Sequence, residues 1–266
     1  MLDAERLKAL EACTLGDSDL SAGEMRAVLA RPEQRVYLAE ADAQAVGFCA
    51  TFETASPQGR RLELDMLGVA EQWRGRGIAQ ALVRRAMGDA AGRGIRSFRA
   101  VVATDNAASA RVFERCGLLP GPERRELLVY TIRGTAPQAY LPGGWQEEAD
   151  GAAADWPTAL RAYGGLPGHQ LALIRDATGS PVAGAALLTV YTIAYSGLWV
   201  EAHWSLGDHA TRALARAAVE RAKAAGLDEV GLLLARSANT SELWVYVEEG
   251  YQRAGTYRWF TRHEDR

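Results

Sequence analysis

Residues 71–77 read EQWRGRG, and the stretch IAQALVRRAM follows directly. Gly75 and Gly77 alternate with Arg74 and Arg76 at the point where apolar spacing predicts that a helix begins. A helix start needs one capping side chain, and each glycine costs conformational entropy. The first N–H groups of a helix and the positive end of its dipole attract anions, and glycine lets an anion approach the backbone. The pattern therefore favours a phosphate-binding loop.

Other phosphate-binding motifs fit this stretch poorly. A dinucleotide-binding G-x-G-x-x-G loop needs a third glycine at position 80, where the chain has Gln80, and it follows its strand directly. A Walker A loop needs a G-K-[ST] triplet, which the sequence lacks. A glycine-rich turn with solvated arginines stays open as the simpler alternative.

The elements around the loop alternate between strands and helices. Composition predicts strands over 35–42, 45–54, 61–69, 96–103 and 124–132. A capping box at Ser21 and Glu24 predicts one helix, a second begins at about Ile78, and a third covers 106–117. The glycine-rich loop therefore connects a long strand to a helix.

The second half of the chain repeats this order. Strands are predicted over 169–177, 180–191, 196–204, 229–235 and 257–262, and helices over 210–226 and 239–250. Asn106 and Gly117 are separated by the same number of residues as Asn239 and Gly250. A repeat of this length indicates a duplicated domain.

The two copies are joined by a stretch without apolar periodicity. Residues 134–155 are rich in Gly, Ala and Pro and therefore predict a linker. We expect domains at 1–135 and 156–266, with the linker at 136–155.

The segments LDMLGVAEQWRGRGIAQALV and NAASARVFERCGL resemble the GNAT superfamily of acyl-CoA N-acyltransferases. Gln72, Gly75 and Gly77 fit the Q-x-x-G-x-G signature of that family, and Asn106 and Phe113 fit its second motif. The resemblance implies an α/β (α+β) fold of two tandem GNAT domains. Each would have a mixed, mostly antiparallel central sheet flanked by helices, with an intact first copy and a degenerate second copy.

The resemblance also implies acetyl-CoA (coenzyme A) as the co-substrate. The backbone of the strand end would bind the pantetheine arm, with a strand bulge at Gly68, and the loop and helix start would bind the pyrophosphate. Asn106 would bind the pantetheine or the acyl group. The cofactor-binding residues implied in this way are Leu67, Gly68, Val69, Gln72, Arg74, Gly75, Arg76, Gly77, Ile78, Ala79, Gln80, Asn106, Ser109 and Phe113.

The second copy departs from the motif at the same place. Its loop reads WSLGDHA, so Gly207 remains while Asp208 stands in place of Arg76. A carboxylate there would repel a pyrophosphate. We therefore expect the first domain to be catalytic and the second to be a scaffold or a wall of the substrate site.

An N-acetyltransferase must remove a proton from its amine acceptor, because an alkylammonium has a pKa near ~10. Glu63, on the strand before the signature, is the first candidate for this general base, since the resemblance to histone-type acetyltransferases implies a base at this position. Asp65 is the second, because a period of two places it on the same face. Both would otherwise be ordinary solvent-facing strand carboxylates.

The acid that would protonate the leaving thiolate is less clear from the sequence. Many members of the family have a tyrosine at the position of Phe113, which has no proton to give. A thiol has a pKa of about 8–9, so water can suffice. Alternatives are an acyl-CoA-binding sensor or scaffold with little turnover, and a mycothiol-synthase-like tandem acetyltransferase, whose second copy is active. Asn239 and Tyr246 keep the tyrosine-bearing motif in the second copy.

Composition narrows the partners. The formal net charge of −3 argues against a nucleic-acid or membrane-surface binder, and no long apolar run predicts a membrane span. Three separated cysteines and an N-terminus without an apolar signal core favour the cytoplasm. The histidines show no metal-ligand spacing, so we expect no metal. The acceptor is expected to be a small-molecule or peptide amine, and the protein a monomer or homodimer.

Overall fold

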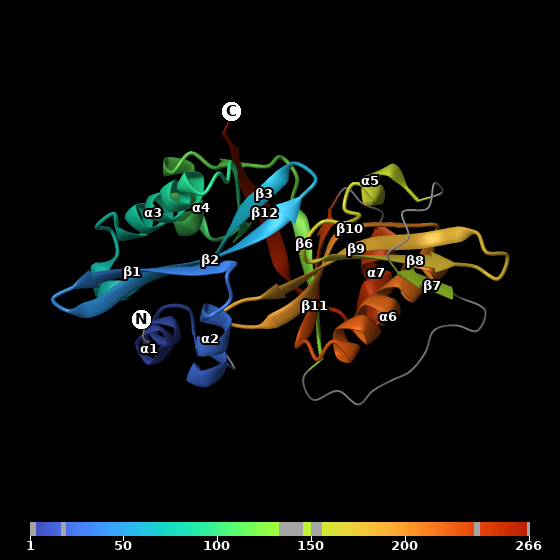
Figure 1. The fold of residues 1–266 in the computed structure, drawn as a ribbon, viewed down its shortest axis with the longest axis horizontal. Coiled ribbons are helices and arrows are strands. Elements are labelled where there is room, and N and C mark those ends of the chain that lie inside the picture. The colour runs from blue at the N-terminus through green and yellow to red at the C-terminus, as the bar shows by residue number, and fades with distance from the viewer. Residues whose placement is uncertain (1–3, 17–19, 133–145, 150–155, 237–239, 265–266) are drawn as a thin grey trace. The chain divides into compact units, whose positions relative to one another are not determined.

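The computed structural model describes residues 4–16, 20–132, 146–149, 156–236 and 240–264 (Figure 1). The chain divides into two compact units. Unit 1 consists of Met1–Pro122, Tyr191–Tyr195 and Arg258–Arg266, and unit 2 of Glu123–Val190 and Ser196–Tyr257. Each unit is a mixed, mostly antiparallel sheet with helices packed on it, which confirms the expected fold class.

The sheet of unit 1 has the order β1-β2-β3-β4-β12, and β5 also pairs with β12. The pairs β1–β2 and β2–β3 are antiparallel, and β3–β4 is parallel. Its strands are β1 (Gln34–Ala41), β2 (Gln44–Ser56), β3 (Gly59–Val69), β4 (Ser97–Ala103), β5 (Leu119–Pro120) and the second half of β12 (Gln252–His263).

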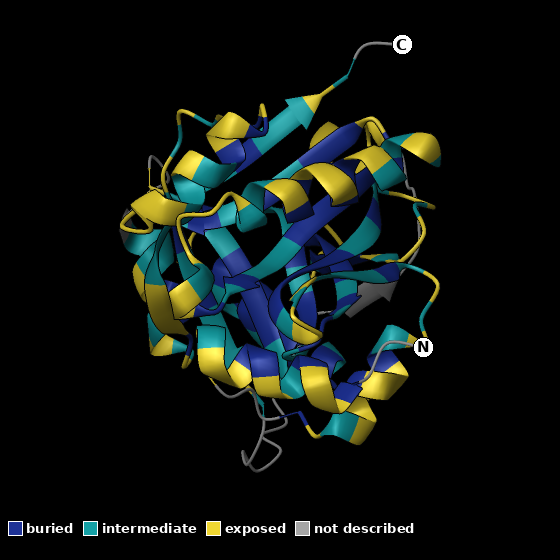
Figure 2. Ribbon diagram, turned by 90° about the vertical axis from the view of Figure 1, so that its left-hand side faces the viewer, coloured by how far each residue is buried: buried dark blue, intermediate teal, exposed yellow. Residues whose placement is uncertain are grey.

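Helices cover both faces of this sheet. They are α1 (Ala4–Leu15), α2 (Ala22–Leu29), α3 (Ile78–Gly92) and α4 (Ala107–Arg115), with a short 3-10 turn, η1 (Glu71–Trp73), before α3. One core joins α1 and α2 to Phe48, and another joins α3 and α4 to Leu62 and Leu64. Figure 2 shows these helices exposed on their outer sides and the strands between them largely buried.

The long strand β3 has a bulge at Asp65. Ala50 of β2 lies opposite Met66 and Thr51 lies opposite Leu64, so Asp65 is the extra residue. A bulge reverses the alternation of side chains between the two faces of a sheet. Leu64 accordingly packs with the α3 and α4 core, whereas Met66 packs with the α1 and α2 core. The bulge expected at Gly68 is therefore wrong by three residues, because Gly68 pairs regularly with Phe48.

β3 also separates from β4 at this bulge. The parallel pairing runs from Arg61 opposite Ser97 to Leu64 opposite Ala100 and goes no further. Both strands continue beyond that point, to Val69 and to Ala103. The backbone of β3 after the bulge is therefore available for other partners on its β4 side.

Unit 2 repeats this plan. Its sheet order is β12-β6-β11-β10-β9-β8-β7, with β10–β11 as the parallel pair. The strands are β6 (Arg125–Thr131), β7 (Gln146–Ala149), β8 (His169–Arg175), β9 (Pro181–Tyr191), β10 (Ser196–Ser205), β11 (Glu229–Ala235) and the first half of β12. The helices are α5 (Thr158–Arg161), α6 (Asp208–Ala224) and α7 (Thr240–Glu248).

The last strand of each sequence repeat contributes to the unit of the other repeat: β6 lies in unit 2, and the second half of β12 lies in unit 1. β6, from the first half of the sequence, pairs with β11 and with Gln252–Tyr257 of β12 in unit 2. β12 itself pairs with β5 in unit 1 at Phe260 and Thr261. The predicted domain boundaries follow chain order, and the compact units do not.

The predicted linker, 136–155, lies mostly outside the described residues. Its only described part, Gln146–Ala149, forms β7 and pairs antiparallel with β8. This part of the linker is a strand because it adds to the edge of the unit 2 sheet.

Candidate active site

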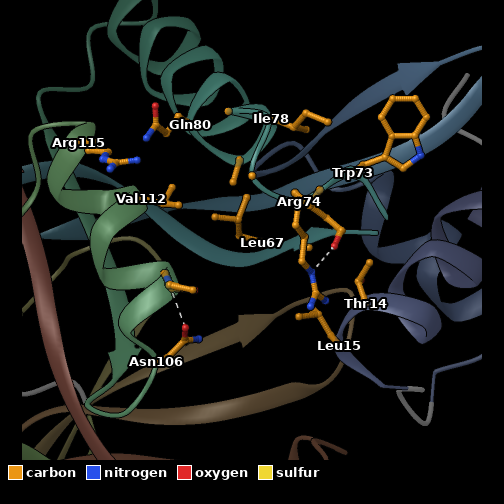
Figure 3. Close-up of a pocket in the computed structure, with 17 residues that line it drawn as sticks. Thr14, Leu15, Leu67, Trp73, Arg74, Ile78, Gln80, Asn106, Val112 and Arg115 are labelled. Carbon is orange, nitrogen blue, oxygen red and sulfur yellow. Dashed lines mark hydrogen bonds between the residues drawn. The ribbon is translucent and has the colours of Figure 1, made fainter. Parts of the chain in front are cut away.

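Unit 1 contains a cavity of about 430 Å³ where β3, the glycine-rich loop, α3 and α4 meet (Figure 3). Most of the residues expected to bind a cofactor line it. They are Leu67, Gly68, Val69, Arg74, Gly75, Gly77, Ile78, Ala79, Gln80, Asn106 and Ser109. Residues far apart in the sequence thus meet at one place, as the two motifs predicted.

The glycine-rich loop has the backbone of an anion site. Gly75 has a φ of 76° and Gly77 a φ of 80°, a region that side-chain-bearing residues rarely adopt. Gly77 is the N-cap of α3, so the N–H groups of Ile78, Ala79 and Gln80 have no acceptor within the helix. A β-carbon on either glycine would meet no atom within 4 Å. The space in front of these N–H groups is therefore open to a ligand.

The two arginines of the loop point in different directions. Arg74 Nε donates a hydrogen bond of 3.0 Å to the carbonyl oxygen of Val69, so its side chain lies along the cavity (Figure 3). Arg76 instead stacks over Trp73, at 4.7 Å, and donates to the carbonyl oxygen of Gln72 at 3.3 Å. Neither Arg76 nor Gln72 is among the residues that line the cavity.

The strand end Leu67–Val69 forms one wall, on the stretch that no longer pairs with β4. Gly68 lets α1 pack directly on the strand, because a β-carbon there would lie 2.5 Å from Thr14 Oγ1 and 2.7 Å from the Phe48 ring. Gly68 is thus required by close packing.

The helix α4 forms the opposite wall. Asn106 is its N-cap and accepts a hydrogen bond of 3.0 Å from the N–H of Ser109 through Oδ1. Phe113 faces the core, where it is 5% exposed and lies 6.3 Å from the ring of Phe260. Phe113 is therefore not in the cavity wall, although the second motif implied a cofactor contact for it.

Glu63 is held in a buried cluster. Its carboxylate receives hydrogen bonds from Arg61 Nε at 2.5 Å, Arg99 Nε at 2.9 Å and Thr54 Oγ1 at 3.0 Å. The residue is 4% exposed and does not line the cavity. This environment keeps the carboxylate satisfied as an acceptor and does not suit a base that must reach an incoming amine.

Asp65 is the extra residue of the β3 bulge, so its position relative to Glu63 does not follow from a period of two. Burial and then the negative charge of Asp65 raise the pKa of the Cys49 thiol to about 12. Asp65 does not line the cavity, whereas Leu67, two residues further along β3, does.

Six further residues line the cavity that sequence reasoning missed: Thr14, Leu15, Trp73, Ala108, Val112 and Arg115. Ala108, Val112 and Arg115 share one face of α4 at helical spacing, a signal that the sequence offered. Thr14 and Leu15 come from the end of α1, and nothing in their types or spacing indicates a site.

Unit 2 differs from unit 1 at the corresponding positions. The parallel strand pairs align the two units, because Leu62 lies opposite Phe98 in unit 1 and Leu198 lies opposite Val230 in unit 2. His203 follows Leu198 by the same number of residues as Leu67 follows Leu62, so His203 corresponds to Leu67. Glu242 occupies the position of Ser109 by its distance from the motif asparagine. His203 Nε2 lies 2.6 Å from Glu242 Oε1. In unit 2, β10 and α7, which correspond to the two walls of the unit 1 cavity, are therefore joined by this hydrogen bond.

The tyrosine that the second motif keeps in unit 2 is buried. Tyr246 is 1% exposed, and its hydroxyl has no hydrogen-bond partner among the described residues. Burial and the charge of Glu242 raise its pKa. Asn239 lies outside the described residues. Tyr246 is thus placed in the core of unit 2, as Phe113 is in the core of unit 1.

A family model described as the acetyltransferase (GNAT) family matches residues 5–118. These residues form a GNAT-family domain. This match covers the strand end, the loop, α3 and α4, which together form the cavity. The match assigns residues 5–118 to a family of acetyltransferases and confirms the resemblance expected from the two motifs.

Solved structures extend the similarity to both units. A GCN5-related N-acetyltransferase from Sphaerobacter thermophilus matches 98% of this chain and 92% of its own, with a TM-score of 0.62 and 16% identity. A tandem GNAT protein from the clavulanic acid biosynthesis pathway matches 98% and 94%, with a TM-score of 0.56 and 15% identity. At these identities the similarity shows the fold. A search of curated proteins found no match.

In the part of the chain that the structure describes, no helix is long and apolar enough to span a membrane. The same described residues contain no group of three His, Cys, Asp or Glu side chains placed to hold a metal ion.

Proposed function

We propose that this protein is an acetyl-CoA-dependent N-acetyltransferase that transfers an acetyl group to a primary amine, with unit 1 as the catalytic unit. One observation carries the proposal. In the unit that matches the family, a single cavity joins the open N-terminus of α3, the end of β3 that does not pair with β4 and the N-cap of α4.

Each wall of the cavity suits one part of acyl-CoA. The N–H groups of Ile78, Ala79 and Gln80 would bind the pyrophosphate. The backbone of Leu67–Val69 would bind the amides of the pantetheine arm, with Asn106 and Ser109 on the other side. Arg74 donates a hydrogen bond to the carbonyl oxygen of Val69 in the structure. When the ligand binds, Arg74 would give up this hydrogen bond and donate to a phosphate oxygen.

The chemical step is a direct transfer. The amine nitrogen attacks the carbonyl carbon of the thioester, the C–S bond breaks, and coenzyme A leaves as a thiolate. We assign the removal of the amine proton to Asp65, directly or through water, because Glu63 is held in buried ion pairs and Asp65 precedes the cavity residue Leu67 by two positions on β3. The thiolate would take its proton from water, since Phe113 has none to give.

Unit 2 would not bind a second acyl-CoA. The stretch between β10 and α6 is short, and Asp208 adds a negative charge in the first turn of α6. The hydrogen bond between His203 and Glu242 fills the place of the pantetheine slot. We therefore expect one equivalent of acetyl-CoA per chain.

The acceptor would be the primary amine of a small molecule or a peptide. We propose neither nucleic acid nor a membrane as a partner. The proposal includes a cytoplasmic location and a monomeric or homodimeric protein. The balance of basic and acidic residues, 30 Lys and Arg against 33 Asp and Glu, supports this choice.

A second candidate function is an acyl-CoA-binding sensor or scaffold with little turnover. Two observations favour it. Glu63 is locked in its ion pairs, and Phe113 supplies no acid. Thiol release in the presence of amines separates a sensor from an enzyme.

The test of the proposed function uses two matched glycines. Gly77 and Gly207 both have a φ of 80°, both are helix N-caps, and a β-carbon on either meets no atom within 4 Å. In calorimetric titrations, wild type and Gly207→Asp are expected to bind one equivalent of acetyl-CoA, and Gly77→Asp is expected to bind none. Free thiol should then form with an amine acceptor in the first two proteins alone.

The contrary outcomes are equally specific. Two equivalents bound to wild type would contradict the assignment to unit 1, and loss of binding in Gly207→Asp but not in Gly77→Asp would move the site to unit 2. Binding without thiol release across a panel of small-molecule and peptide amines would favour the sensor.

A further inference from the structure

The cavity has a cationic end that the proposed function does not yet use. Gln80 and Arg115 lie at one end of it, and Thr14 and Leu15 lie at the other (Figure 3). Arg115 is the last residue of α4, and Asn106 is the N-cap of the same helix. At 1.5 Å per residue, α4 carries the cavity wall over about 13 Å from Asn106 to Arg115.

Arg115 has no carboxylate partner among the described residues. Its side chain is exposed and lines the cavity. Arg84, on α3 one turn after Gln80, likewise has no ion pair there and donates its hydrogen bond of 3.1 Å to the backbone oxygen of Arg115. This end of the cavity therefore carries two arginines, Arg115 and Arg84, that have no carboxylate partner among the described residues.

The carbonyl groups at the C-terminus of α4 also have positively charged partners. The C-terminus of a helix carries a partial negative charge on its last carbonyl groups. Arg84 covers the carbonyl of Arg115, and Arg262 covers that of Cys116 with a hydrogen bond of 3.0 Å. Burial raises the pKa of the Cys116 thiol, and Arg84 and Arg262 act in the opposite direction, as expected for a positive field.

We propose that Arg115, with Arg84 behind it, binds the 3′-phosphate of acyl-CoA, so that the protein distinguishes coenzyme A from 3′-dephospho-coenzyme A. The inference rests on the proposed function, which places the pyrophosphate on Gly75–Gln80 and the acyl end at Asn106. The nucleotide must then lie toward the other end of α4. A phosphate monoester there carries nearly two negative charges and accepts charge-assisted hydrogen bonds from a guanidinium group.

The test compares two ligands on three proteins at one ionic strength. Wild type, Arg115→Ala and Arg85→Ala are titrated calorimetrically with coenzyme A and with 3′-dephospho-coenzyme A. Arg85 is the control, because it is an exposed arginine of α3 beside Arg84 that does not line the cavity. Its substitution changes the net charge by the same amount.

Wild type and Arg85→Ala are expected to bind coenzyme A about tenfold more tightly than the dephosphorylated form. Arg115→Ala is expected to bind both ligands equally, at the affinity that wild type has for 3′-dephospho-coenzyme A. Its far-ultraviolet circular dichroism should match that of wild type, since the side chain is exposed.

Three results would overturn the inference. They are equal binding of the two ligands by wild type, an unchanged preference in Arg115→Ala, and an equal loss of preference in Arg85→Ala. If wild type binds neither ligand, the proposed function itself fails. Binding of both without preference leaves that function intact and removes only the phosphate site.

Discussion

The hydroxyl group of Thr14, on α1, lies against the bare backbone of Gly68, on β3. A β-carbon on Gly68 would be 2.5 Å from Thr14 Oγ1, closer than non-bonded atoms approach. Thr14 is fixed there by a hydrogen bond of 2.7 Å from Oγ1 to the carbonyl oxygen of Leu10. The first helix thus reaches the cavity through a contact that only glycine permits.

Gly68→Ala is therefore expected to lower the free energy of unfolding by about 1–3 kcal/mol, because α1 or the Phe48 ring must move. The same movement should widen or distort the slot and weaken acetyl-CoA binding. Chemical denaturation and calorimetric titration measure the two effects.

Gly88→Ala provides the control for this substitution. Gly88 lies within α3, and a β-carbon there meets no atom within 4 Å. Alanine favours a helix over glycine by roughly 1 kcal/mol, so this variant should be slightly more stable and bind as wild type does. Equal effects of the two substitutions would show that Thr14 and Gly68 are not tightly packed.

The two carboxylates of β3 are expected to respond in opposite ways to removal of their charge. Glu63→Gln should destabilise the protein by about 3 kcal/mol, since it leaves Arg61 and Arg99 buried without their counter-ion. Asp65→Asn should retain stability and lower kcat at least a hundredfold if Asp65 is the base.

The readouts are denaturation for stability and a thiol-release assay at saturating acetyl-CoA. A pH–rate profile adds a second criterion. Asp65→Asn should lose the acidic limb, along which the rate rises with pH as the base is deprotonated, while Glu63→Gln should keep this limb when it is assayed at a temperature at which it is folded. The base would have to be reassigned if Asp65→Asn retained full kcat.

Glu229, on β11, makes the stability of unit 2 depend on pH. Burial and the charge of Asp228 raise its pKa from 4.5 to about 7. The folded state therefore favours the protonated carboxyl, and this contribution is complete below pH 4.5 and is lost as the pH rises through 7. Glu229→Gln, which stays neutral, should be more stable than wild type at pH 8 by about 2–3 kcal/mol.

The measurement is the free energy of unfolding of both proteins from pH 4.5 to pH 8. The difference between them should grow across this range. Glu220→Gln is the control, because its side chain is 37% exposed and pairs with Lys223. A difference that does not change with pH would contradict the prediction for Glu229.

Local sequence patterns predicted the elements of the cavity well. The capping box at Ser21 and Glu24 is present, and α3 begins at Ile78 as the apolar spacing indicated. Gly75 and Gly77 adopt the positive φ angles that explain their presence. These features depend on residues close in sequence, which is why they could be predicted.

Features that depend on distant residues were predicted poorly. The ion pairs of Glu63 include Arg99, which a parallel strand brings alongside. A single inserted residue, Asp65, puts Leu64 and Met66 on opposite faces of the sheet, and a period-two argument has no means to detect it. Thr14 enters the cavity wall because α1 packs on β3, and its own sequence carries no sign of that contact.

The exchange of final strands has a consequence for biosynthesis. The first half of the chain leaves the ribosome well before β12 is synthesised. Unit 1 nevertheless includes Arg258–Arg266, which contains the second half of β12. The cavity of unit 1 would therefore lie on a sheet with one unpaired edge until translation is nearly finished. An exposed strand edge readily pairs with other chains. A polypeptide that is truncated or stalled before β12 would therefore expose an aggregation-prone edge and would not fold as an independent domain.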